Sequence, residues 1–381
     1  MDSIDILIQN VSAQCVPNLV AIHTFKPKQV IWIYSDESKS SLNRLKLASQ
    51  AWVETQQQWH VDVRNSESLE AVLKKHFEAL TVQGKVVFHL TCGTKSMALQ
   101  GMMQLARFRQ QKGADVYGVV MDPHTQQFDM VFPLAKNDAY ACRGLRFEEV
   151  LNVHGSWRQQ GSGRDMAALK DVYEPLQSLR ALHDDMMQAL DQRSLCSRDD
   201  AKAQGYYLRG GNDLPMVVQE GLYLAQDAGV IRELSIQKQY FTFSSVCCEN
   251  PYAYIRNMWM EDWVGAVLAK HDDGQWSGGY SGVKVSIKSP EDYQEFDFLG
   301  VRNNHLVYWS CKNTRDVKTP YFFEIDALRD EVGGRDFHVA GLVHTADIQV
   351  ALRKKAKRLG VHLVQITQAD AQERLLEVSL K

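Results

Sequence analysis

The chain has 381 residues, of which 45% are hydrophobic and 23% are charged, a composition typical of a globular protein. At roughly 100–200 residues per domain, this length predicts two or three domains. The formal net charge of −3 excludes a protein drawn to nucleic acid by its overall charge, so any such contact must come from local patches.

The cysteines form no CxxC pair and are odd in number, which is not expected of a disulfide framework or a structural zinc site. They are Cys15, Cys92, Cys142, Cys196, Cys247, Cys248 and Cys311. The N-terminus lacks the basic and apolar regions of a signal peptide, and no stretch approaches 18 apolar residues. We therefore expect a cytoplasmic protein.

Residues 1–150 are predicted to form one α/β domain, because short apolar strands alternate with helical patterns. The expected strands are 4–9, 29–35, 59–63, 85–90 and 115–121, and the expected helices are 40–58, 68–80 and 94–111. This order favours a doubly wound, Rossmann-like, mostly parallel sheet. Residues 121–132 then predict a hairpin that turns at Asp122-Pro123.

A Gly/Ser/Gln-rich segment, residues 155–164, is predicted to be a linker. Residues 165–250 indicate helices followed by an alternating strand pair, which is typical either of a small winged-helix module or of a helical connector. Residues 251–381 predict a third, α/β domain. Its helices are expected at 254–270, 322–332 and 348–360, and its strands at 283–288, 295–301, 305–312, 337–343 and 361–366.

The most distinctive local feature is the loop HLTCGTKSM, residues 89–97. It follows a buried strand and opens a helix, whose free N–H groups and aligned dipoles favour an anion. Gly93 permits a sharp turn, Thr91, Thr94 and Ser96 offer hydroxyls, and Lys95 offers a positive charge. The alternative is that a threonine only caps the helix. The loop lacks P-loop spacing and no GxGxxG follows the first strand, so an NTPase or a dehydrogenase is disfavoured.

The turn after the first strand is QNVSAQCVPN, residues 9–18, which is polar and contains a Pro-Asn. Together, this turn and the 89–97 loop resemble the CARF domain of type III CRISPR effectors, with Cys92 standing where family members often have glycine. The resemblance implies a homodimer that binds a cyclic oligoadenylate such as cyclic tetra-adenylate, whose ring size the sequence leaves open. Carried over by position, the ligand-binding residues would be Ser12, Gln14, Asn18, Thr91, Gly93, Thr94, Lys95 and Met97. No residue indicates whether the domain also degrades its ligand.

The C-terminal third contains an acidic helix residue, Glu261, a strand aspartate, Asp297, and a strand lysine, Lys312. Glu295 precedes Asp297 by two residues and so shares its face of the strand. This order resembles the nuclease half of CARF-coupled PD-(D/E)xK effectors, as do Asp326, Arg329 and Asp330 further on. The resemblance implies Mg²⁺ or Mn²⁺ held by Glu261, Glu295 and Asp297, with Lys312 as a further catalytic residue.

The family pattern has an acidic residue where this chain has Ser310, a candidate auxiliary catalytic residue. Three readings are open: the remaining carboxylates hold the metal and the enzyme is active; the site is weakened and Ser310 holds a water; or cleavage is lost and the domain only binds nucleic acid. The expected function is thus a ligand-activated nuclease acting on DNA or RNA in antiviral defence, with a non-cleaving, ligand-responsive binding protein as the alternative.

The basic run RKKAKR, residues 353–358, is compatible either with phosphate contacts or with the solvated face of an amphipathic helix. The tryptophans of this region are expected in the core; they are Trp259, Trp263, Trp276 and Trp309.

Overall fold

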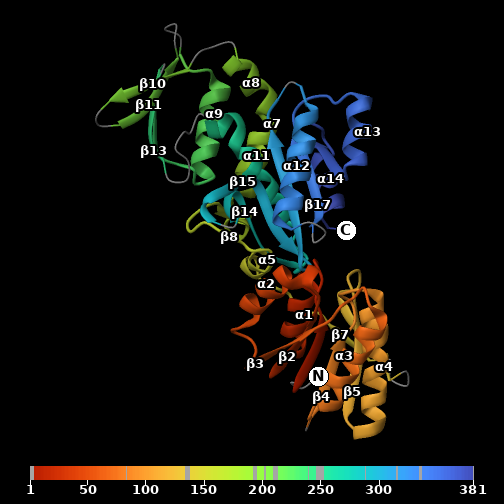
Figure 1. The fold of residues 1–381 in the computed structure, drawn as a ribbon. Helices are drawn as coiled ribbons and strands as arrows, with labels where there is room; N and C mark the ends of the chain where they lie inside the picture. Colours follow the sequence, from red (N-terminus) through yellow and green to blue (C-terminus); the bar gives the residue numbers. More distant parts are fainter. Residues whose placement is uncertain are drawn as a thin grey trace. The chain divides into compact units, whose positions relative to one another are not determined.

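The computed structural model divides the chain into two compact units, Met1–Trp157 and Arg158–Lys381 (Figure 1). It describes residues 4–380 except 83, 134–137, 192–194, 201–202, 209–212, 239, 246–252, 288, 315 and 334–336, and for 191–212, 240 and 245 it describes at most the backbone. The side chains of Cys196, Cys247 and Cys248 therefore lie outside the described part. No helix among the described residues is long and apolar enough to cross a membrane.

Unit 1 is a doubly wound sheet in the order β3-β2-β1-β4-β5-β6-β7, which confirms the predicted Rossmann-like fold. The first five of these strands are parallel, and β6 and β7 are antiparallel additions. The strands are β1 (Ile6–Asn10), β2 (Gln29–Tyr34), β3 (Thr55–His60), β4 (Lys85–His89), β5 (Asp115–Asp122), β6 (Gln127–Phe132) and β7 (Ala139–Ala141). The hairpin expected around Asp122-Pro123 is the β5–β6 pair.

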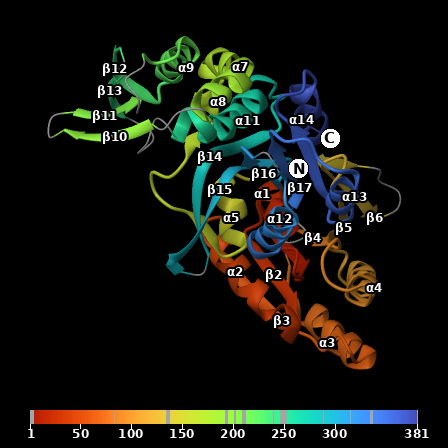
Figure 2. The same cartoon turned by 90° about the horizontal axis from the view of Figure 1, so that it is seen from above.

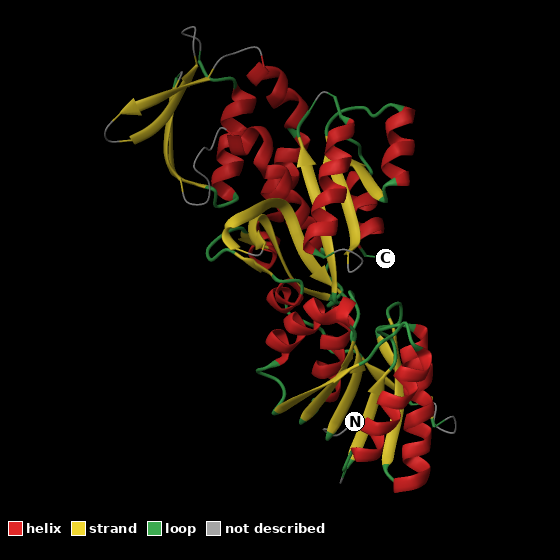
Figure 3. Ribbon diagram, viewed as in Figure 1, coloured by secondary structure: helices red, strands yellow, loops and turns green. Residues whose placement is uncertain are grey.

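Two groups of helices enclose this sheet (Figure 3). One group holds α1 (Val16–Phe25), α2 (Lys39–Ser49) and α5 (Phe147–Val153), and the other holds α3 (Ser66–Ala79) and α4 (Lys95–Lys112). Because both faces are covered, β1 and β4 are almost wholly buried and read as continuous apolar runs.

The helix expected over 40–58 is too long: α2 ends at Ser49 and β3 begins at Thr55. The predicted helix includes the glutamines between Thr55 and Trp59. They belong to an edge strand, where solvent reaches side chains that a central strand would have to bury.

Unit 2 is built on a sheet in the order β18-β17-β16-β15-β14-β8, with β9 paired to β14. Its antiparallel part is β14 (Trp276–Ile287), β15 (Ser289–Arg302) and β16 (His305–Lys312), and its parallel part continues through β17 (Phe337–His344) and β18 (Val361–Gln365). The turn between β15 and β16 has positive φ at both Asn303 (49°) and Asn304 (66°), as a tight hairpin of this hand requires.

The helices of the C-terminal part of unit 2 are α11 (Trp259–Lys270), which follows a π-helical turn at Tyr254–Met258, and α12 (Thr319–Val332), α13 (Val350–Arg358) and α14 (Ala371–Ser379). Helix α11 is buried along nearly its whole length because it packs against the sheet and against α6 and α7. Trp259, Trp263 and Trp309 are fully buried in the same cluster and Trp276 packs against it, which confirms that they are core residues.

The middle segment shares unit 2 with the C-terminal elements. It holds α6 (Met166–Leu169), α7 (Tyr173–Ala181), α8 (His183–Asp191) and α9 (Met216–Asp227), and a four-stranded antiparallel sheet of β10 (Leu195–Asp200), β11 (Ala203–Leu208), β13 (Tyr240–Ser245) and β12 (Ile231–Gln237). The side chains of α7 and α9 join one hydrophobic cluster with α11.

The segment 155–164 is more ordered than a free linker. It contains β8 (Ser156–Arg158) and leads into β9 (Arg164–Asp165), and the Gln159 amide donates to the Lys284 carbonyl at 2.8 Å. Gly163 has φ 75°, and a Cβ there would lie 3.0 Å from the Ser281 carbonyl oxygen. The glycine thus permits close approach to β14, a use that composition does not distinguish from flexibility.

Candidate functional site

The loop between β4 and α4 is fixed by its own threonines. The Thr94 side chain caps α4 by accepting from the Met97 amide at 3.2 Å. Thr91 Oγ1 accepts from the Met121 amide at 2.7 Å and ties the loop to β5. Lys95 and Ser96, at the start of the helix, are exposed. The alternative that a threonine caps the helix is therefore confirmed for Thr94. Lys95 lies at the N-terminus of the same helix and is exposed to solvent.

Gly93 brings this loop onto the end of β1. Its φ is 83°, and a Cβ at this position would lie 2.6 Å from Asn10 Cβ and 3.2 Å from Met97 Sδ. Asn10 is the last residue of β1, and Met97 is buried beneath the loop. Strands β1 and β4 are neighbours whose following helices cover opposite faces, the switch point at which open α/β sheets bind ligands.

The turn after β1 contacts the β4–α4 loop. Cys92 Sγ lies 3.7 Å from the Gln14 carbonyl oxygen, and Ser12 Oγ accepts from the Gln14 amide at 3.2 Å. Gln14 is exposed, whereas Asn18 is fully buried and donates to Gln9 Oε1 at 3.1 Å. Asn18 therefore supports the turn from beneath, while Ser12 and Gln14 lie at its surface.

A buried polar cluster beneath the two loops was not predicted. His89 Nδ1 lies 3.0 Å from Gln9 Oε1, and burial lowers the His89 pKa to about 3, so the ring is neutral. Both side-chain polar atoms of Asn10, and Gln9 Nε2 and His89 Nε2, are buried and have no hydrogen-bond partner among the described residues. The only signal in the sequence is that polar residues end two otherwise apolar strands, at Asn10 and His89.

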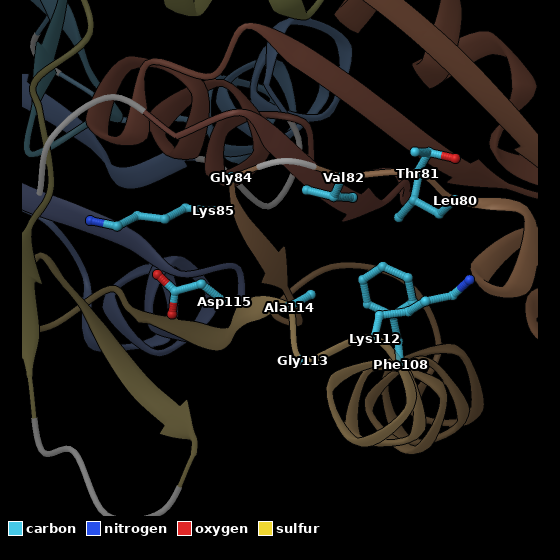
Figure 4. A pocket seen from close by; sticks show the side chains of 10 residues that line it. All are labelled: Leu80, Thr81, Val82, Gly84, Lys85, Phe108, Lys112, Gly113, Ala114 and Asp115. Atoms are coloured by element: carbon cyan, nitrogen blue, oxygen red, sulfur yellow. The ribbon is translucent and has the colours of Figure 1, made fainter.

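A separate hollow of about 600 Å³ lies at the opposite, amino-terminal ends of β4 and β5 (Figure 4). It is lined by Leu80, Thr81, Val82, Gly84, Lys85, Phe108, Lys112, Gly113, Ala114 and Asp115. Since the predicted loop follows the carboxyl end of β4, this hollow is not the predicted ligand site.

In unit 2, Asp297 is the centre of the predicted site. Its Oδ2 accepts from the Cys311 amide at 2.6 Å and from Ser310 Oγ at 3.0 Å, and lies 3.5 Å from Lys312 Nζ. The hydrogen-bonded pairing of β15 with β16 ends at Phe298–Trp309. Beyond that pair, the Cys311 N–H has no backbone acceptor on β15, and it donates to the Asp297 carboxylate instead. The separation of the strands thus gathers three of the predicted residues in one place.

Glu261 faces the same region from α11. Burial, followed by the negative charges of Asp297, Asp262 and Glu295, raises the pKa of Glu261 well above 4.5, against the opposing charge of Lys312. Its Oε2 lies 3.3 Å from the Cβ position of Gly282, a residue with φ 58° on β14. The three predicted carboxylates therefore interact electrostatically and form an excess of negative charge.

The neighbouring Asp262 has a different task. It is 3% exposed, and its carboxylate is bonded by Arg164, by Ser281 and by Tyr254 Oη, the last at 2.6 Å. Fully hydrogen-bonded in this way, Asp262 holds α11 against β9 and β14, and the carboxylate left for chemistry on this helix is Glu261.

Lys312 is held as a cation. Burial alone would lower its pKa, but the charges of Asp297 and Glu324 outweigh burial and the pKa is raised. Lys312 therefore supplies positive charge and does not act as a base. Glu324, an exposed residue of α12, was not predicted, because only the fold brings that helix near Lys312.

Ser310 is 1% exposed, and its hydroxyl is bonded to Asp297. Among the described residues, no group of three or more His, Cys, Asp or Glu side chains is close enough to hold a metal ion. Two carboxylates completed by water are nevertheless a usual magnesium site, and hard oxygen ligands are what Asp297 and Glu261 offer. The donor set fits Mg²⁺ or Mn²⁺ with fewer protein ligands than the family pattern has.

The later residues that resembled the nuclease family lie elsewhere. Arg329 pairs with Asp326 one turn away and donates to the Leu359 carbonyl at 3.2 Å, while Asp330 is exposed. Arg329 thus joins α12 to the end of α13, and no contact between these three residues and Asp297 is present in the described part of the chain.

Comparison with known families decides the identity of unit 1. Residues 6–154 match the family model of the Card1 CARF domain. Unit 1 is a CARF domain. The matched residues include the turn after β1 and the β4–α4 loop, and therefore both Ser12 and Lys95. No curated protein sequence matches the chain significantly.

Solved structures resemble the CARF domain and unit 2 together. VC1899 from Vibrio cholerae has a TM-score of 0.73 at 15% identity, over 99% of this chain and 97% of its own. Can2 from Sulfobacillus thermosulfidooxidans, solved with cyclic tetra-adenylate, has a TM-score of 0.67 at 14% identity, over 98% and 97%. A type III CRISPR defence DNA nuclease activated by cyclic oligoadenylate has a TM-score of 0.54 at 14% identity, and this chain covers 53% of its length. At these identities the likeness establishes a shared fold.

Proposed function

We propose that the chain is a cyclic-oligoadenylate-activated, metal-dependent nuclease that works as a homodimer in cytoplasmic CRISPR defence. The observation that carries the proposal is the convergence of Lys312 and Ser310 on Asp297, beside Glu261, in a chain whose other unit is a CARF domain. A CARF domain supplies a receptor for the signal, and the charged cluster supplies chemistry for a phosphodiester.

The ligand would bind across the first turn and the β4–α4 loop. Gln14 and Lys95 are exposed, as are Thr91 and Thr94, and Ser12 is half-buried. The free N–H groups at the start of α4 favour an anion. Gly93, Asn18 and Met97 would hold the shape of the site from beneath. Thr91 and Thr94 would fix the loop through their hydrogen bonds while lying at its surface. The ligand class is supported by the CARF match and by cyclic tetra-adenylate bound to Can2, which shares the fold.

At the second site, the substrate would be a phosphodiester of DNA or RNA. Lys312, kept charged by Asp297, would stabilise the negative charge that develops on the phosphate oxygens. Glu261 and Asp297, with Glu295 at the rim, would hold Mg²⁺ or Mn²⁺, which when bound offsets phosphate charge and lowers the pKa of a bound water. The raised pKa of Glu261 supports this assignment, because a cation there relieves the repulsion among the carboxylates.

Activation would require the ligand to bind the cleavage-competent arrangement more tightly than the resting one. Its binding energy at the CARF domain can shift the population only by that difference in affinity.

A second candidate is a ligand-responsive protein that binds nucleic acid without cutting it. The observation in its favour is Ser310, a buried neutral residue bonded to Asp297 where the family pattern has a carboxylate. A site with one acidic ligand fewer would hold a metal more weakly.

The two candidates are separated by a cleavage assay on supercoiled plasmid and on labelled single-stranded DNA and RNA, in Mg²⁺ or Mn²⁺, with and without cyclic tetra-adenylate. The parent, Lys312→Ala and Ser310→Glu are compared. Ligand-dependent cutting that Lys312→Ala abolishes supports the nuclease. Cutting only by Ser310→Glu would instead show an intact scaffold with a disabled site and would establish the binding protein.

A further inference from the structure

Helix α13 is strongly cationic, and part of this positive charge does not stabilise the helix. Five of the six residues Arg353–Arg358 are cations, and Arg353, Lys354, Lys357 and Arg358 are exposed. Among the described residues, none of these side chains pairs with a carboxylate. Arg353 and Lys357, and Lys354 and Arg358, are like charges four residues apart, which destabilise a helix. Cations at a helix C-terminus are favourable, but only those in the last turn gain from it.

A large aromatic side chain lies beside this helix. Phe323 of α12 is 51% exposed, and Lys355 Nζ lies 4.5 Å from the centre of its ring. Six residues further along α12, Arg329 donates to the Leu359 carbonyl just beyond α13. The two contacts advance along both helices in the same direction, so α12 and α13 lie side by side and parallel (Figure 2).

This surface adjoins the Asp297 cluster. Strands β16 and β17 are parallel, so Lys312 and His344 pair at the same edge of the sheet, and the loops leading to α12 and α13 leave from that edge. Glu324, next to Phe323, is near enough to Lys312 to raise its pKa. Helices α12 and α13 therefore begin near the edge of the sheet that holds Lys312.

We propose that Phe323 and the cations of α13 form a track that binds a single nucleic-acid strand and leads it to Lys312. A ring with an exposed face stacks on any base, and a row of lysine and arginine side chains follows the phosphates without regard to sequence. The phosphates of a nucleic-acid strand would neutralise the positive charge of α13. The inference rests on the proposed function, because it names how the substrate reaches the proposed site.

The test uses the full chain with cyclic tetra-adenylate and EDTA, so that binding is measured without cleavage. Affinity for fluorescein-labelled oligothymidylate and oligouridylate is followed by anisotropy at several salt concentrations. For Lys354→Gln/Arg358→Gln we expect weaker binding and a salt dependence shallower by about 1.4 in log–log slope, at about 0.7 for each lost single-strand phosphate contact. Lys74→Gln/Lys75→Gln, a matched exposed pair on α3, should leave both unchanged.

The aromatic residue is tested separately. Phe323→Leu should weaken binding roughly 5- to 150-fold with little change in salt slope, and Phe323→Trp should retain it. Parent-like affinity and slope in Lys354→Gln/Arg358→Gln would overturn the track, while cleavage by the parent would leave the proposed function standing. A parent that neither binds nor cuts would overturn both. If light scattering shows that Phe323→Leu changes the oligomeric state, the surface belongs to a second copy and the track is wrong.

Discussion

The two candidate sites are built in opposite ways. The CARF loop carries one exposed cation, Lys95, on a framework of neutral groups: backbone N–H groups at the start of α4, threonine hydroxyls, and a buried His89 that stays uncharged. The Asp297 cluster instead uses charges that shift one another's pKa. The charge of the neutral framework does not change with pH. The carboxylates of the Asp297 cluster repel one another, and a bound cation would relieve that repulsion. The two sites should therefore answer differently to substitution.

The largest expected effect is that of Lys312→Ala on cleavage. Removing a fixed cation aimed at developing phosphate charge should lower the rate about 10²- to 10³-fold. Binding of cyclic tetra-adenylate, measured by calorimetry, should stay as in the parent because the CARF site contains no part of this cluster. Loss of ligand binding as well would show that the substitution damages the whole chain.

Gly93→Ala tests the neutral site. The residue must keep φ near 83° and the new Cβ would meet Asn10 at 2.6 Å, so the loop has to move. We expect ligand affinity to fall roughly 10- to 100-fold, on the order of 1–3 kcal/mol, because the clash with Asn10 displaces the loop. Gly113→Ala is the control, since its φ is 62° but no atom lies within 4 Å of its Cβ position. Equal losses in the two variants would mean that strain, and not the closeness of Asn10, sets the effect.

Thr94→Ala separates capping from ligand contact. The loss of a threonine cap should lower the free energy of unfolding by about 1 kcal/mol. Asn65→Ala removes the equivalent cap of α3, which accepts from the Ser68 amide at 3.0 Å, and should cost a similar amount. Only Thr94→Ala should also weaken ligand binding. Unchanged affinity would remove Thr94 from the ligand site.

The smallest expected effect is the change in thermal stability caused by Glu261→Gln. The folded-state pKa of Glu261 is raised above 4.5, so the folded chain holds this proton more tightly than the unfolded chain does. Stability is therefore lost as pH rises from the unfolded value through the folded one. Glutamine avoids that loss, and the melting temperature should rise by about 2–4 °C at pH 8, the response to about 1 kcal/mol in a domain of this size. The gain should vanish below about pH 4.5, near the ordinary pKa of a glutamate.

Scanning calorimetry of the parent and Glu261→Gln at both pH values checks this. Cleavage should fall in the same variant, because a destabilising carboxylate is retained for function. A variant less stable at pH 8 than the parent would contradict the charge excess inferred for the cluster.

The fold was largely predictable from the sequence because periodic apolar patterns specify strands and helices, and the Asn303-Asn304 turn and the 89–97 loop are local. What failed were features set by tertiary context. The β3 glutamines are polar because they lie on an edge, and Gly163 serves close packing with β14. Neither the edge position of β3 nor the close packing of Gly163 against β14 can be predicted from the local sequence.

The same distinction applies to the sites. Residues 91–97 lie in one loop, so their proximity followed from spacing alone. Glu261, Asp297 and Lys312 come from three elements, and only the order of the motifs suggested that they meet. Glu324 and the Gln9–His89 pair were missed because a solvent-exposed helix residue and two strand ends carry no local signature. The roles assigned to the predicted site residues stay predictions.

The central claim, that ligand on the CARF domain controls chemistry at Lys312, is tested most directly with Lys95→Ala, an exposed change at the start of α4. Cyclic tetra-adenylate would be titrated twice, once against binding and once against the cleavage rate, for the parent and this variant. We predict that both midpoints shift to higher ligand concentration by the same factor while the cleavage rate at saturation is unchanged. Cleavage that proceeds without ligand, or an activation midpoint that stays fixed while binding weakens, would contradict the account.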